Sequence, residues 1–168
     1  IIEGVMRSLI HSSYKALENP RAYEARSNIM WCATMGLNTI TGLSKQQDWE
    51  VHMIEHQLGA YTDCPHGEGL AVISPAYYRY ICKYGIDKFV RFAKNIWDVP
   101  ADDIDKETAA LAGIDALACY IEKLGLPSTL REVGATEDML EKIAVSCVKG
   151  GGYKQMDEND VLNVIKAC

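Results

Sequence analysis

Apolar residues recur at the spacing of an α-helix along almost the whole chain, and this periodicity restricts the possible folds most strongly. At the start of the chain, Ile2, Val5, Met6 and Leu9 fall on one helical face. The same spacing predicts further helices over residues 49–60, 86–97, 103–124, 136–148 and 157–165. No segment shows a convincing strand pattern. We therefore predict an all-α, multi-helix domain of about eight helices, held together by packing of their apolar faces.

Capping residues suggest where several of these helices begin and end. Asn19-Pro20 is typical of a helix start, with Asn as the N-cap and Pro at the first helical position. We expect the helix that follows to end near Gly42. Thr136 and Asp157 are predicted to begin the last two helices, because threonine and aspartate are favoured at N-caps.

The segment Leu70–Pro75 is ambiguous, since a short apolar run could also be a buried strand. The aromatic run Tyr77–Tyr84 continues an apolar face with helical spacing. We therefore interpret both segments as one buried helix, kinked at Pro75, that begins around His66.

Charge and hydropathy indicate which partners to expect. The chain has 17 Lys and Arg against 23 Asp and Glu, a net charge of −6. A negative surface repels phosphate, so we expect neither nucleic acid nor an anionic membrane as a partner. No apolar run approaches the ~18 residues that cross a bilayer. The chain starts at Ile1 without a signal-peptide pattern, as expected of a fragment or a processed chain.

Two absences further narrow the chemistry expected of these residues. The six cysteines contain no C-x-x-C pair, which argues against a zinc knuckle or a disulfide scaffold and favours a cytoplasmic location. No G-x-G-x-x-G is present, because Val72 stands where the third glycine after Gly67 and Gly69 should be. These residues are therefore not expected to bind a nucleotide phosphate.

Three of the four histidines crowd into fifteen residues: His52, His56 and His66. His52 and His56 are four apart, so they lie one turn apart on one face of the predicted helix. Because the loop at residues 61–65 is short, the next helix must fold back and bring His66 near the pair. Three imidazoles suit a divalent transition metal better than magnesium or calcium. The fourth, His11, is interpreted as a surface or core residue.

Two other interpretations of these histidines remain open. Residues 52–56 also read H-x-x-E-H, the pattern of a zinc metallopeptidase in which Glu55 would activate a metal-bound water. That chemistry needs a further acidic ligand, for which Glu68, Glu107 or Glu122 could be nominated without any specific signal. The histidines could also be incidental in a non-catalytic helical interaction module.

Several segments resemble the iron-containing alcohol dehydrogenases. Residues 48–61, followed by Pro65-His66-Gly67 and Ala71, resemble the C-terminal signature H-x-x-x-H-x-L-x-A or L-G-A, a short loop and then H-G. Other segments resemble further family elements, in family order: residues 23–31, 124–131 and 157–165. The sequence at Asp48-Trp49 and at residues 28–31 is most similar to the branch of the NADPH-dependent butanol dehydrogenases and aldehyde reductases.

The resemblance implies a fold and a set of site residues. Residues 1–168 would form the helical C-terminal metal-binding and substrate domain of a dehydroquinate synthase-like fold, without the α/β nucleotide-binding domain. The family binds one divalent metal, Fe²⁺ or sometimes Zn²⁺, between its two domains. His52 and His66 match two of its metal ligands, while an Asp and another His come from the absent domain. His56 matches a catalytic histidine near the nicotinamide that helps to pass protons and does not bind the metal.

The resemblance also implies a reaction and partners. Hydride would pass between NAD(P)H, bound mainly by the absent domain, and a small aldehyde or primary alcohol whose oxygen the metal polarises. The full-length enzyme would be a homodimer, and the 168 residues alone would be inactive. Glu55 is expected to lie off the histidine face, as a solvated or helix-pairing charge.

Overall fold

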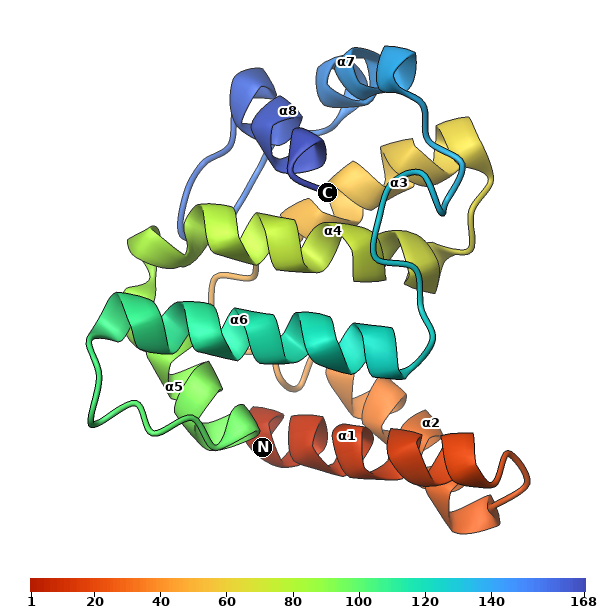
Figure 1. The fold of residues 1–168 in the computed structure, drawn as a ribbon, viewed down its shortest axis with the longest axis vertical. Helices are drawn as coiled ribbons and strands as arrows, with labels where there is room; N and C mark the ends of the chain where they lie inside the picture. Colours follow the sequence, from red (N-terminus) through yellow and green to blue (C-terminus); the bar gives the residue numbers. More distant parts are fainter. The chain divides into compact units, whose positions relative to one another are not determined.

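The computed structural model describes residues 1–168, which form two compact units, residues 1–46 and 47–168. Its regular elements are eight α-helices and one short 3₁₀ helix, with no strand (Figure 1). The predicted all-α class is therefore confirmed. None of the helices combines the length and the apolar character that a membrane crossing needs.

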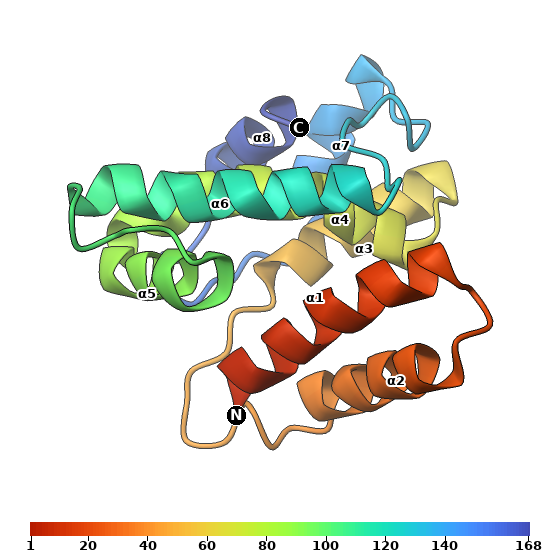
Figure 2. The same cartoon turned by 60° about the horizontal axis from the view of Figure 1, so that its bottom comes forward.

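The first unit is a pair of helices, α1 (Ile2–Glu18) and α2 (Tyr23–Leu37), that pack side by side in opposite directions (Figure 2). The residues buried in these helices are small: Ser12, Ala25 and Cys32. Large apolar side chains of α2 are exposed instead, among them Tyr23, Met30 and Trp31.

The predicted boundaries of the second helix are wrong at both ends. Asn19 ends α1, its N–H donating to the Lys15 carbonyl at 3.0 Å, and its side chain accepts from the Arg21 N–H at 3.1 Å. Asn19 and Pro20 therefore form a turn, because an Asn side chain can satisfy turn backbone as well as a helix start. The helix begins at Tyr23 and ends at Leu37, after which Thr39 has a positive φ of 72° that no helix accommodates.

The second unit is built on α3 (Glu50–Thr62) and α4 (His66–Ile81), which pack against each other. The ambiguous apolar segment lies within α4, which continues through Pro75, so the helical interpretation is confirmed. Ile54 and Leu58 of α3 and Ile73 and Tyr77 of α4 are almost fully buried. These side chains form the centre of the core that carries both histidine-bearing helices.

The remaining helices cover this pair from two sides (Figure 1). After the 3₁₀ helix Cys82–Tyr84, α5 (Ile86–Trp97) packs tightly on α6 (Lys106–Lys123), and α6 packs on α4. Towards the C-terminus, α7 (Glu137–Ser146) packs on α3, and α8 (Glu158–Lys166) packs on α4 and α7. Thr136 and Asp157 are the N-caps of α7 and α8, as predicted.

The loop at Gly150–Gly152 fixes the start of α3. The Gly150 N–H donates to the buried Glu50 carboxylate at 2.6 Å, and the Gly152 N–H donates to Asp48 at 2.9 Å. The Tyr77 hydroxyl also donates to Asp48, at 2.8 Å. A β-carbon on Gly152 would lie 2.9 Å from that of Asp48, so the approach requires glycine. The first turn of α3 is thereby fastened to residues about a hundred positions away.

Candidate metal centre

The site begins with two histidines one turn apart on α3. His52 and His56 lie on one side of the helix, with ring centroids 6.3 Å apart. The ring of Trp49, just before the helix, lies 5.1 Å from that of His52. His52 is half-buried, and His56 is exposed.

A tight turn between α3 and α4 brings the third histidine to this pair. Asp63 adopts a left-handed conformation with φ of 58°, and its N–H donates to the Gly59 carbonyl at 2.8 Å. This closes α3, and Pro65 leads directly into His66, the first residue of α4. The His66 ring centroid lies 5.3 Å from that of His52 and 5.7 Å from that of His56. The structure thus brings together all three histidines that the sequence singled out.

The donor atoms of the three imidazoles suit a divalent transition metal. One ring nitrogen from each histidine lies within 4.8 Å of the others. Two nitrogens bound to one metal at about 2.1 Å each are at most about 4.2 Å apart, so small side-chain rotations suffice. Imidazole is a good ligand for both iron and zinc. The residues present therefore fit the metal that the sequence implies, while the division of roles among the three rings stays a prediction.

The surroundings of His52 favour the neutral ring. Partial burial lowers the pKa of His52, and the positive charges that His66 and His56 could carry lower it further. Only a neutral imidazole can bind a metal. On the same helix, burial raises the pKa of Glu50, although the N–H of Gly150 partly opposes this.

Of the two roles expected for Glu55, a solvated or a helix-pairing charge, the solvated one is wrong. Only 2% of the residue is exposed, and its carboxylate contacts Nδ1 of His66. The burial arises because α4 crosses α3 at Gly69, where a β-carbon would lie 2.7 Å from Cγ of Glu55. A glycine one turn after His66 is the sequence signal that could have indicated this close crossing.

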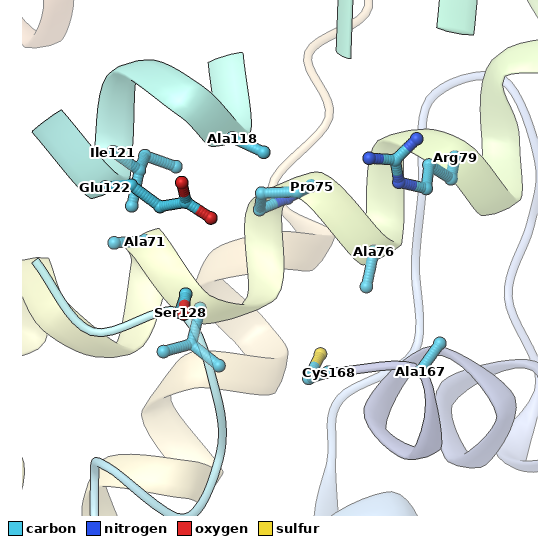
Figure 3. Close-up of a pocket in the computed structure, with 11 residues that line it drawn as sticks. Ala71, Pro75, Ala76, Arg79, Ala118, Ile121, Glu122, Ser128, Ala167 and Cys168 are labelled. Atoms are coloured by element: carbon cyan, nitrogen blue, oxygen red, sulfur yellow. The ribbon is translucent and has the colours of Figure 1, made fainter. Parts of the chain in front are cut away.

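The other chemically active residues named from the sequence lie outside the cluster. Neither His11, exposed on α1, nor any of Glu68, Glu107 and Glu122 belongs to the group of potential metal ligands. Glu122 instead lines a separate cavity of about 250 Å³ between α4, α6 and the C-terminal end (Figure 3). Its walls are mostly small apolar residues, and its one cation, Arg79, pairs with Asp115 at 2.5 Å. Chemistry on a bound metal is therefore expected at the histidines.

Comparisons with known proteins agree with this geometry. Residues 1–168 match the sequence model of the Fe-containing alcohol dehydrogenase family, C-terminal. The chain is 36% identical to NADH-dependent butanol dehydrogenase A of Clostridium acetobutylicum, over 99% of this chain and 44% of that protein. It is 31% identical to the NADPH-dependent aldehyde reductase YqhD of Escherichia coli, over 94% of this chain and 40% of that protein. The chain thus spans less than half the length of these relatives.

Solved structures give the same result. The crystal structure of NADH-dependent butanol dehydrogenase A from Thermotoga maritima matches with a TM-score of 0.91 and 30% identity, over 98% of this chain and 44% of that one. Escherichia coli K-12 YqhD matches with a TM-score of 0.92 and 26% identity, over 98% of this chain and 43% of that one. The resemblance predicted from the sequence, including its butanol dehydrogenase and aldehyde reductase branch, is confirmed.

Proposed function

Because the chain belongs to the Fe-containing alcohol dehydrogenase family, as its C-terminal part, we propose that residues 1–168 are the metal-binding and substrate half of a nicotinamide-dependent oxidoreductase. The full-length protein, meaning this chain together with a nucleotide-binding domain, transfers hydride between NAD(P)H and a small aldehyde or primary alcohol. The cluster of three imidazoles within 4.8 Å is the observation that carries this proposal. The names of the relatives, butanol dehydrogenase and aldehyde reductase, support the substrate class.

In this proposal His52 and His66 bind the metal, Fe²⁺ in the first place and Zn²⁺ as the alternative. They project from two successive helices that the buried core holds together, so their backbone positions are set before any ion binds. An Asp and a His of the nucleotide-binding domain complete the ligand set. When bound, the metal supplies a Lewis acid for the substrate oxygen.

His56 has a different task, near the nicotinamide. Hydride transfer to an aldehyde carbon leaves negative charge on its oxygen, which must then take up a proton. We propose that His56 passes a proton between that oxygen and solvent, which its exposure and its distance of 5.7 Å from the ring of His66 support. In alcohol oxidation the proton moves the opposite way.

The metallopeptidase alternative requires Glu55 to activate a water molecule. Its carboxylate is buried and contacts His66, which supports a role behind the ligand rather than beside a substrate. A cytoplasmic location remains part of the proposal, supported by six free cysteines. So does a homodimeric full-length enzyme.

The test measures butanal reduction by the full-length protein with NADH and with NADPH. Activity should appear after loading with Fe²⁺ or Zn²⁺, and His52→Ala and His66→Ala should each lower kcat/KM by roughly 100-fold or more, since each removes a metal ligand. His11→Ala, on α1, is the matched control and should retain wild-type activity.

Two results would overturn the proposal: full activity in either ligand variant, or hydrolysis of a peptide substrate without any nicotinamide oxidation.

A further inference from the structure

A buried carboxylate lies directly behind one of the proposed metal ligands. Glu55 sits on α3 between His52 and His56 in sequence, and 3% of its side chain is exposed. It contacts Nδ1 of His66, whose own side chain is 52% exposed. The cluster of donor atoms that could hold a metal comprises the three imidazoles and does not include Glu55.

The contact joins Nδ1 of His66 to a carboxylate, and the chemistry of that partner bears on which ring nitrogen carries the proton. An ionised carboxylate can only accept hydrogen bonds, so Nδ1 must donate to it. In a neutral ring the remaining nitrogen, Nε2, then holds the free lone pair. That lone pair is what a metal requires, and the ring plane is fixed by the same bond.

Two glycines confine the carboxylate to this position. A β-carbon on Gly69 would lie 2.7 Å from Cγ and 2.9 Å from Oε1 of Glu55, and one on Gly59 would lie 3.3 Å from Oε1. The side chain therefore fills the space that glycine leaves between α3 and α4. Burying a charge in such a space is costly unless it meets a hydrogen-bond donor, and His66 supplies one.

We propose that Glu55 is a positioning residue of the metal centre, which holds His66 in the Nδ1-protonated tautomer with Nε2 presented for coordination. This rests on the proposed function, since His66 is a ligand only in that proposal. Glu55 touches neither substrate nor metal in it, and acts through His66 alone.

The first measurement needs no metal. Long-range ¹H–¹⁵N spectra of the metal-free, full-length protein with ¹⁵N-labelled histidine report which ring nitrogen carries the proton, with the His66 signals assigned by their loss in His66→Ala. In the wild-type protein His66 should be protonated at Nδ1. In Glu55→Gln, whose neutral amide can both donate and accept, the Nε2-protonated form should appear.

The second measurement is Co²⁺ or Zn²⁺ affinity. Glu55→Gln should weaken binding roughly 10- to 100-fold, the usual effect of losing such a partner. Glu50→Gln is the matched control, because Glu50 is also a buried carboxylate of α3 but accepts from the Gly150 N–H in place of a histidine. It should leave the His66 tautomer unchanged and should alter the metal affinity by no more than about twofold.

An Nε2-protonated His66 in the wild-type protein would overturn the inference without any variant. An unchanged tautomer and affinity in folded Glu55→Gln would overturn it as well, while leaving the oxidoreductase proposal intact. A different result would contradict the broader oxidoreductase proposal: metal binding that persists in His66→Ala.

Discussion

At the residue scale, Glu55 and Gly69 pack so closely that a substitution at one position should alter the effect of a substitution at the other. We expect Gly69→Ala to destabilise the protein, because its new methyl group would meet Cγ of Glu55 at 2.7 Å. In a Glu55→Ala background the obstruction is gone, and alanine is favoured over glycine in a helix by roughly 1 kcal/mol. The same change should then be neutral or stabilising.

Urea unfolding of the four proteins in this cycle measures the coupling between the two positions. It should amount to at least about 1 kcal/mol. Gly67→Ala serves as the control, because nothing lies within 4 Å of a β-carbon there, although it is in the same first turn of α4. Additive effects of Gly69→Ala and Glu55→Ala would contradict the close fit.

The same pair shows what single residues do and do not reveal in a sequence. The proximity of His52, His56 and His66 could be predicted from the sequence, because a spacing of four and a short loop fix their relation within two adjacent helices. The burial of Glu55 had only one sequence signal, Gly69, and that signal does not tell which face α4 presents to α3. That face is set by core side chains from both helices.

At the scale of elements, the apolar periodicity predicted where the helices lie, but it did not always predict where they begin and end. The predicted segment 86–97 is the observed α5, Ile86–Trp97, because both of its limits are marked by local residues. The end of α2 was missed because local turns, not an apolar face, determine it. The attachment of Gly150–Gly152 to α3 is invisible in the sequence, since its partners lie about a hundred residues away.

The hydrogen bonds at the start of α8 predict how the stability of the fold depends on acidic pH. Asp160 accepts hydrogen bonds from the Tyr80 hydroxyl at 2.6 Å, from the Asp157 N–H at 2.9 Å and from Lys154. Burial by itself would raise the pKa of Asp160, but these donors outweigh it and hold the pKa below its usual range. A carboxyl with a lowered pKa in the folded state stabilises the fold fully above its unfolded pKa of about 3.9. That stabilisation is lost as the pH falls through the lower, folded-state pKa.

We therefore expect Asp160→Asn to lower the free energy of unfolding by a constant amount above about pH 5, and by progressively less below about pH 4. Urea unfolding of both proteins from pH 3 to pH 7 checks this. Asp103→Asn, which removes an exposed carboxyl before α6, is the control and should follow the wild-type curve. A difference between wild type and Asp160→Asn that does not shrink in acid would contradict the network around Asp160.

At the scale of the whole molecule, the proposed function requires more metal ligands than this chain provides. A tetrahedral site needs four, and in the proposed enzyme this chain provides two of them, His52 and His66, with His56 close by. The chain covers only 44% of the length of butanol dehydrogenase A of Clostridium acetobutylicum. The family resemblance predicts this shortage, because only His52 and His66 match the family's ligands, whereas the spacing alone leaves all three histidines as candidates.

The 168 residues alone should therefore bind Zn²⁺ or Fe²⁺ roughly 100-fold or more weakly than the full-length protein, and should not reduce butanal with either nicotinamide cofactor. Three imidazoles on a preformed helix pair still attract an ion, so titration calorimetry should detect weak binding that His52→Ala abolishes and His11→Ala does not. Adding the nucleotide-binding domain should raise the affinity and the activity together, because both depend on the same two missing ligands. Tight, stoichiometric binding by the 168 residues alone would instead mean that His56 is a third ligand, and its proposed role in proton transfer would have to be abandoned.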